Sequence, residues 1–226
     1  MFLQHSGLAR ALQGKSGPAT AAIMTKRILI LAVFLALLAA TLWVWRASGL
    51  PPLGKPAAAA GGDFTLQSAD GPVSLKDLRG KVVLLYFGYT YCPDVCPTSL
   101  ALITQALKQM TPEEQARVQV VFVSVDPERD TPQRLKEYIA FFRPGGIGLT
   151  GTPEQVAQAA KQYGAVYRKQ AVTSAAGYVV DHSSYTYILG PDGTLRGKLL
   201  HAATPSEMVR EIRTALTATA NRQSEQ

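Results

Sequence analysis

The sequence of 226 residues predicts an α/β domain that follows an amino-terminal membrane-spanning helix. A charge-free apolar run lies near the amino terminus, and after it strand-like apolar segments alternate with segments of helical periodicity. Charge separates the same two parts, because the first 60 residues hold no acidic residue but six basic ones: Arg10, Lys15, Lys26, Arg27, Arg46 and Lys55. The other 17 basic and 16 acidic residues nearly cancel, which argues against a nucleic-acid partner for the domain.

The apolar run Ile28 to Trp45 has the length and composition of a membrane span. It holds 18 residues without a charge, and a spanning helix needs about 20, within a range of roughly 17–25. Trp43 and Trp45 stand at its far end, where indole rings favour the headgroup layer. A cleaved signal peptide is the alternative, since Ala47-Ser48-Gly49 follows, but its apolar region has only about 7–15 residues. We therefore predict a retained anchor over residues 28–45.

Positive charge predicts the orientation of this anchor. Four basic residues precede the apolar run and two follow it, so residues 1–27 are expected on the cytoplasmic side. The chain is then a single-pass inner-membrane protein with a periplasmic domain. Met24 is an alternative start, and residues 1–23 receive no structural assignment. Residues 46–62 form a linker rich in Pro, Ala and Gly, residues 63–220 form the domain, and residues 221–226 form a tail.

Two continuous apolar segments predict the central strands of the domain. Val82 to Phe87 and Val118 to Val125 are rich in β-branched and aromatic residues, as in strands buried on both faces. Between them, Pro97 to Met110 carries apolar residues at helical spacing. A strand–helix–strand unit of this kind joins parallel strands.

The remaining elements are predicted from caps, turns and alternation. A short hairpin between Phe64 and Leu75 precedes the first core strand. The elements that follow are helices from Thr131-Pro132 to about Phe142 and from Thr152-Pro153 to about Tyr163, strands over 166–172, 184–189 and 195–200, and a last helix from Thr204-Pro205 to about Ala218. This order fits a thioredoxin-like three-layer sandwich. Such a sheet carries its chemistry where the first core strand ends and the next helix begins.

Two cysteines lie at that junction, Cys92 in the predicted turn and Cys96 at the start of the helix. The amino terminus of a helix favours the thiolate and so lowers the pKa of a thiol there. The spacing C-x-x-x-C is one residue wider than the redox motif C-x-x-C. It leaves room for an ion between the sulfurs and still permits a disulfide.

His182, expected just before a core strand, completes a soft set of three ligands with the two cysteines. Two thiolates and one imidazole suit Cu(I), and sites of this type also hold Cu(II), so one copper ion per chain is predicted. Zinc would favour a fourth ligand. His201 follows a strand and its direction is left open, whereas His5 precedes the membrane segment. Asp94 and Asp181 are expected to cap turns, with orientation of the His182 ring as the alternative for Asp181.

Three motifs together resemble the SCO/SenC family of copper chaperones. They are Tyr91-Cys92-Pro93-Asp94-Val95-Cys96-Pro97, Ser124-Val125-Asp126-Pro127-Glu128-Arg129-Asp130-Thr131-Pro132 and Val180-Asp181-His182-Ser183. The resemblance covers residues 61–218 and implies a thioredoxin-like fold with copper held by Cys92, Cys96 and His182. It also implies delivery of copper to the binuclear copper A site of cytochrome c oxidase. The expected partners are that oxidase subunit and other copper carriers or thiol reductants. Asp126 and Arg129 are expected to be structural, with Arg129 pairing a carboxylate.

Two functions remain open at this point. A copper carrier needs all three residues, with both sulfurs reduced. A thiol–disulfide oxidoreductase that reduces the oxidase cysteines needs only Cys92 and Cys96, one as nucleophile and one as resolving thiol. A peroxidase is disfavoured, because Thr90 precedes Cys92 by two positions and no Thr-x-x-Cys motif occurs.

Overall fold

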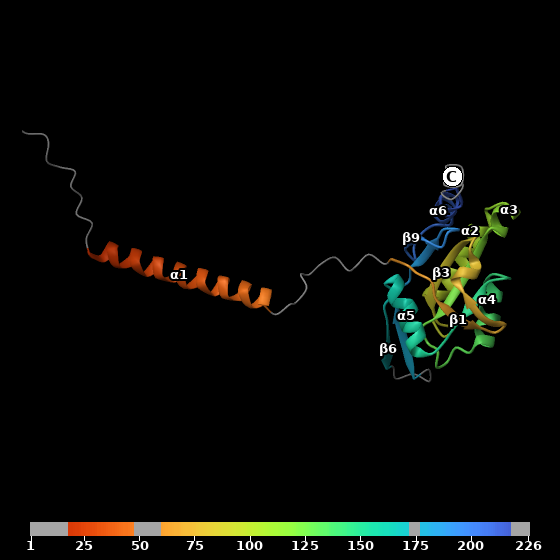
Figure 1. The fold of residues 1–226 in the computed structure, drawn as a ribbon, viewed down its shortest axis with the longest axis horizontal. Coiled ribbons are helices and arrows are strands. Elements are labelled where there is room, and N and C mark those ends of the chain that lie inside the picture. Colours follow the sequence, from red (N-terminus) through yellow and green to blue (C-terminus); the bar gives the residue numbers. More distant parts are fainter. Residues whose placement is uncertain (1–17, 48–59, 172–176, 218–226) are drawn as a thin grey trace, which may run out of the picture. The chain divides into compact units, whose positions relative to one another are not determined.

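The computed structural model describes residues 18–47, 60–171 and 177–217 (Figure 1). The chain divides into two compact units, Met1–Pro56 and Ala57–Gln226, which are described separately. The expectations for residues 1–17, for most of the linker and for the tail lie outside the described residues.

The first unit contains one helix, α1 (Pro18–Ala47), among its described residues. Within it, Lys26–Val44 is long and apolar enough to cross a bilayer, in agreement with the span expected over residues 28–45. Its large apolar side chains are exposed, Trp43 at 72% and Phe34 at 61%, as a helix solvated by lipid requires. The helix begins at Pro18, inside the segment 1–23 that received no structural assignment. Proline is well suited to this first helical position.

A five-stranded sheet forms the centre of the second unit, with strand order β5-β4-β3-β8-β9. The predicted parallel pairing of β3 with β4 is confirmed, and β5 extends the parallel part. β8 and β9 add the predicted antiparallel hairpin. Every residue of β3 is buried, as its continuous apolar sequence predicted. The strands are β3 (Val82–Gly88), β4 (Val118–Ser124), β5 (Ile147–Leu149), β8 (Thr186–Leu189) and β9 (Leu195–Leu199).

Four of the helices begin with the same Thr-Pro pair. The threonine hydroxyl accepts a hydrogen bond from a backbone N–H of the first turn, and proline occupies a position that needs no donor. These helices are α3 (Pro112–Ala116), α4 (Pro132–Phe142), α5 (Pro153–Tyr163) and α6 (Pro205–Thr217). The domain also contains two helices without a Thr-Pro start, α2 (Val95–Lys108) and the short 3₁₀ helix η1 (Leu75–Leu78).

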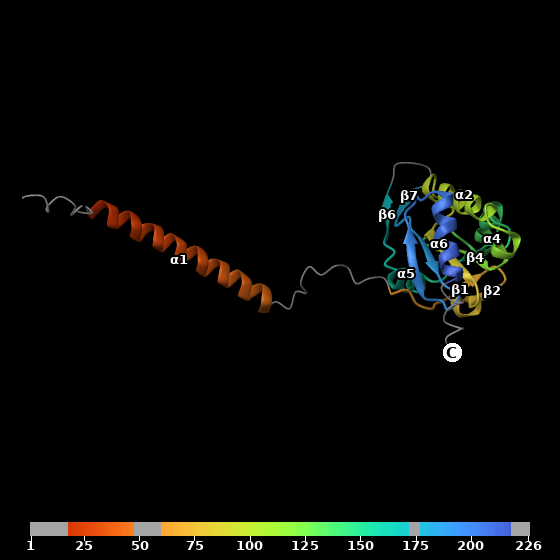
Figure 2. The same cartoon turned by 90° about the horizontal axis from the view of Figure 1, so that it is seen from above.

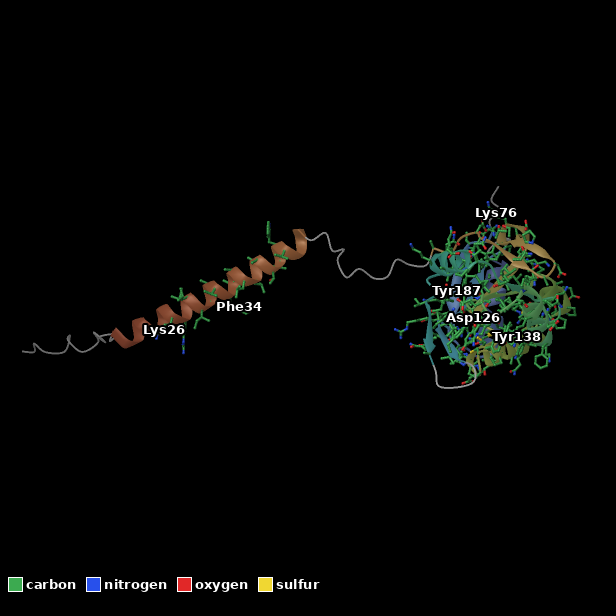
Figure 3. All side chains as sticks on the ribbon, turned by 90° about the horizontal axis from the view of Figure 1, so that it is seen from below. Lys26, Phe34, Lys76, Asp126, Tyr138 and Tyr187 are labelled. Carbon is green, nitrogen blue, oxygen red and sulfur yellow. The ribbon has the colours of Figure 1, made fainter. Side chains whose placement is uncertain are left out.

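Helices cover both faces of the sheet, which makes the predicted three-layer sandwich (Figure 2). Neighbouring residues of β3 point to opposite faces. Tyr86 stacks on Phe122, which contacts Tyr138 of α4, and α2 packs against both α4 and α6. Phe87 instead meets Tyr163 of α5 and Tyr187 of β8. Figure 3 draws the side chains of the domain as sticks and labels Tyr138 and Tyr187.

Two hairpins lie outside the five-stranded sheet. The predicted leading hairpin is β1 (Thr65–Ser68) with β2 (Gly71–Ser74). The strand expected over 166–172 is β6 (Tyr167–Ala171), and it pairs with β7 (Tyr178–His182) in a separate two-stranded sheet. The expectation that His182 lies just before a core strand is confirmed, because β8 begins at Thr186, and His182 is itself the last residue of β7. Because most residues of β7 are half-exposed, its sequence Tyr-Val-Val-Asp-His shows little alternation of apolar and polar residues.

Candidate metal centre

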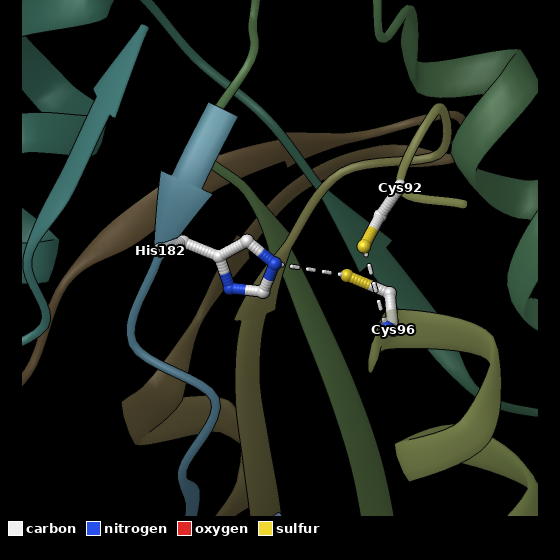
Figure 4. Close-up of side chains that lie close together, drawn as sticks. All are labelled: Cys92, Cys96 and His182. Carbon is white, nitrogen blue, oxygen red and sulfur yellow. Dashed lines mark hydrogen bonds between the residues drawn. The ribbon is translucent and has the colours of Figure 1, made fainter. Parts of the chain in front are cut away.

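Three separate elements bring Cys92, Cys96 and His182 together (Figure 4). Cys92 lies in the loop after β3, Cys96 is the second residue of α2, and His182 ends β7. Their two sulfurs and a ring nitrogen all lie within 4.8 Å of one another. The structure thus assembles the three residues that the sequence analysis singled out.

Gly88, the last residue of β3, makes room for Cys96. A Cβ atom at this position would lie 2.6 Å from the Cys96 sulfur and 3.0 Å from the Phe122 ring. Any side chain here would push the sulfur away from its present place. The absence of a side chain at the end of β3 therefore lets the first turn of α2 approach the sheet closely.

The two thiols have different environments. Cys92 is 8% exposed, and its sulfur accepts a hydrogen bond from the Cys96 backbone N–H at 3.4 Å. The Cys96 thiol, His182 and the amides of Asp94 and Cys96 together lower the pKa of Cys92 to about 4, although burial opposes them. Cys96 is fully buried, and burial raises the pKa of its thiol. The site therefore favours the thiolate at Cys92 over the thiolate at Cys96.

Hydrogen bonding defines which nitrogen of His182 faces the sulfurs. Nδ1 lies 3.1 Å from the Ser183 carbonyl oxygen, which only accepts, so Nδ1 carries the proton. Nε2 then presents its lone pair toward the Cys96 sulfur, 3.3 Å away. The rings of Tyr86 and Tyr89 meet the imidazole edge-on, with centroids at 6.2 and 5.8 Å. A set of two buried sulfurs and one half-buried imidazole fits a soft ion such as Cu(I).

A pocket of about 360 Å³ opens onto the site. Cys92 and His182 line it, whereas Cys96 does not. The rest of its wall is formed by Tyr89, Pro93, Asp94, Val95, Val179, Val180, Asp181 and Ser184. An incoming ligand from solvent would therefore reach the site on the side of Cys92 and His182.

A buried carboxylate holds the loop before Cys92, a role that the sequence did not predict. Asp130 is fully buried and accepts hydrogen bonds from the Thr90 N–H at 2.9 Å, the Thr90 hydroxyl at 2.6 Å and the Ser124 hydroxyl at 2.7 Å. Asp130 precedes the Thr-Pro cap of α4, which looks like a surface turn in the sequence. Only the tertiary fold shows that it contacts the loop after β3.

Asp126 and Arg129 form an ion pair beside this loop. Asp126 is fully buried two residues after β4 ends, and the expectation that Arg129 pairs with a carboxylate is confirmed. Neither residue contributes an atom to the Cys–Cys–His group.

The other candidate residues lie outside the group. Nδ1 of His201 meets the Ser99 hydroxyl at 2.7 Å on α2, and His5 lies outside the described residues. Asp181 sits within β7 rather than in a turn, and its carboxylate accepts from the Gln170 amide at 2.9 Å. The expected turn cap is therefore wrong for Asp181, and the Ser183 carbonyl rather than Asp181 orients the imidazole. Asp94 is the N-cap residue of α2, but its side chain makes no capping bond.

The thiolate gives a first testable prediction for the reduced, metal-free protein. Because the pKa of Cys92 is lowered, its thiolate absorbance near 240 nm should persist through neutral pH and disappear as the pH falls through about 4. In denaturant the same transition should move to about 8.5, the ordinary value for a thiol. Cys92→Ser should remove the low-pH transition. A wild-type transition only above pH 7 would show that the site does not favour a thiolate.

Comparison with known proteins places this geometry in context. Residues 54–217 match the family model described as SCO1/SenC. The bovine (Bos taurus) mitochondrial SCO2 homolog is 39% identical over 166 residues, which is 73% of this chain and 62% of that protein. The chain thus spans less than two thirds of this curated relative.

Solved structures agree with the fold. ScoI from Bradyrhizobium japonicum, with copper bound, is 37% identical, with a TM-score of 0.63 over 70% of this chain and 99% of the other. BsSco, described as a member of the Sco family of cytochrome c oxidase assembly proteins, is 29% identical, with a TM-score of 0.56 over 72% of this chain and 96% of the other. A disulfide switch has been identified in BsSco.

Proposed function

The chain belongs to the SCO1/SenC family, and on that premise we propose that it is a membrane-anchored carrier that delivers one copper ion to the copper A site of cytochrome c oxidase. The observation that carries the proposal is the Cys92–Cys96–His182 group, whose three ligand atoms lie within 4.8 Å of one another. Relatives with copper bound support copper as the cargo.

The ligand set suits a carrier better than a permanent metal site. Three protein ligands leave one side of a soft ion open to a fourth. The pocket exposes the Cys92 and His182 side of the group, so a thiolate of the acceptor can approach there. Exchange of protein ligands for acceptor ligands then moves the ion, with Cys96 buried behind it.

The expected location follows from α1 and the charge around it. A helix with a segment long enough to span a bilayer precedes the copper-binding domain. With its basic flank in the cytoplasm, the anchor places the domain in the periplasm. We propose residues 28–45 as the anchor, 46–62 as the linker and 63–220 as the domain.

A thiol–disulfide oxidoreductase is the second candidate function. The observation that favours it is the pairing of a Cys92 thiolate, exposed to the pocket, with a buried Cys96 thiol. Cys92 would attack an acceptor disulfide, and Cys96 would resolve the mixed disulfide. Two electrons and the Cys96 proton then pass to the acceptor, and a second proton comes from solvent, which leaves two thiols there and a Cys92–Cys96 disulfide here.

One experiment separates the two functions. The acceptor is the soluble copper A domain of an oxidase subunit II, prepared without copper and with its cysteines either reduced or oxidised. Copper-loaded carrier protein should generate the copper A absorbance with the reduced acceptor, and His182→Ala should abolish that transfer. If metal-free protein instead only reduces the oxidised acceptor, and His182→Ala does so equally well, the carrier proposal fails and the reductase stands.

A further inference from the structure

The strand that carries His182 does not belong to the sheet that positions the cysteines. β7 pairs along its length with β6, in a two-stranded sheet separate from the five-stranded one. Cys92 and Cys96, by contrast, follow directly from β3 at the centre of the main sheet. Residues 183–185 join His182 to β8 of the main sheet, and the direction of β7 before this link depends on contacts to the loops after β3 and β4.

Arg129 makes several of these contacts. Its guanidinium pairs with Asp126 and donates from Nη1 to the Tyr178 carbonyl oxygen at 3.1 Å. The same guanidinium stacks over the Tyr178 ring, 3.7 Å from the centroid. The Tyr178 hydroxyl in turn donates to Asp126 at 2.7 Å. Tyr178 is thus held through its backbone, its ring and its hydroxyl.

The contact at Tyr178 bears directly on His182. Tyr178 begins β7 and His182 ends it, four residues later, so both side chains project from the same face of the strand. Fixing one end of so short a strand fixes the direction of the other. The Arg129 side chain is 17% exposed and the Asp126 side chain is fully buried. Water therefore competes little for the hydrogen bonds between Arg129, Asp126 and Tyr178.

Tyrosines of the cysteine loop complete the connection. The guanidinium carbon of Arg129 lies 4.7 Å from the Tyr91 ring centroid and 5.8 Å from that of Tyr89. The Tyr89 hydroxyl accepts from the Val180 backbone N–H at 3.2 Å, and its ring meets the imidazole of His182. One guanidinium therefore contacts the residues on both sides of the metal centre.

We propose that Arg129 is a positioning residue that holds His182 against Cys92 and Cys96 and so determines whether the carried copper has two protein ligands or three. The inference deepens the proposed function and rests on it for the identity of the cargo. A lysine cannot replace the arginine, because it lacks the planar fork that bonds Asp126 and the Tyr178 carbonyl together while stacking on a ring.

Arg134 offers a matched control for a test on the full-length protein in detergent. It stacks over the same Tyr91 ring at 4.2 Å and donates to the Thr90 hydroxyl at 2.7 Å, but it is an exposed residue of α4 and does not lie against Tyr178. We expect Arg129→Gln to weaken Cu(I) binding about tenfold in competition with a chelator, and Arg134→Gln to change it less than twofold. Arg129→Lys should behave as Arg129→Gln, and it carries the test if the glutamine variant does not fold.

Two further readouts distinguish positioning from a general loss of stability. In the His182→Ala background, Arg129→Gln should weaken copper binding no further, because the ligand it positions is already absent. In the metal-free protein, backbone amides of β7 should exchange with deuterium at least tenfold faster in Arg129→Gln, while those of β3 and β4 keep their protection.

These experiments test the positioning role of Arg129 separately from the copper-carrier function. Unchanged copper affinity in Arg129→Gln, or an equal loss in the presence and absence of His182, overturns the role of Arg129. Unchanged exchange of β7 overturns it as well. A wild-type protein that binds no copper contradicts the carrier function instead, and the exchange measurement on metal-free protein still tests whether Arg129 holds β7.

Discussion

Replacing His182 with alanine should weaken Cu(I) binding at least tenfold, equivalent to about 1.4 kcal/mol. The substitution removes the only nitrogen of the Cys–Cys–His group and leaves two sulfurs to hold the ion. The fold should persist, because His182 is half-buried at the end of a strand outside the main sheet. Competition with a Cu(I) chelator under anaerobic, reducing conditions measures the change.

His201→Ala is the matched control for this prediction. His201 is the other histidine within the described domain, and its ring contacts Ser99 on α2 rather than either sulfur. We expect this variant to keep the copper affinity of the wild type within twofold. Equal losses in the two variants would contradict the assignment of His182 as a ligand.

Replacing Asp130 with alanine should lower the free energy of unfolding by about 3 kcal/mol. The carboxylate is fully buried and accepts from three donors, and donors left buried without a partner each cost about 1–3 kcal/mol unless the loop opens to water. The loop that opens is the one that carries Cys92, so copper binding should weaken as well. Urea unfolding of the reduced, metal-free protein measures the stability change.

Asp70→Ala serves as the control for Asp130. Asp70 also bonds a polar side chain, Lys136, but its own side chain is 74% exposed. Exposed ion pairs contribute about 0.2–1 kcal/mol, so this variant should unfold at nearly the wild-type urea concentration. A loss below 1 kcal/mol for Asp130→Ala would show that the three hydrogen bonds do not stabilise the loop.

The sequence predicted the central part of the domain well, because local signals agree there with the tertiary fold. The continuous apolar runs at Val82 and Val118 identified β3 and β4, and three Thr-Pro pairs marked the starts of α4, α5 and α6. The junction between β3 and α2 located both cysteines. The proposed ligand set rests on residue chemistry and on resemblance to a family.

The contacts that complete the site could not be predicted, because they join residues distant in the sequence. β7 lacks the periodicity of a buried strand, because it pairs with β6 in a separate sheet. Side chains, rather than a strand of the main sheet, make its other contacts. The bonds of Asp130 to Thr90 span 40 residues, and that of Arg129 to Tyr178 spans 49. Asp181, beside His182 in sequence, was the plausible partner for the ring, yet alternation along the strand turns it to the opposite face.

X-ray absorption at the copper edge of the Cu(I)-loaded protein tests the central claim most directly. It counts the sulfur and nitrogen neighbours of the ion without reference to activity. We predict two sulfurs and one nitrogen per copper in the wild type, two sulfurs and no histidine nitrogen in His182→Ala, and one copper per chain. A wild-type ion with only sulfur neighbours, or with the same neighbours in His182→Ala, would contradict a carrier site formed by Cys92, Cys96 and His182.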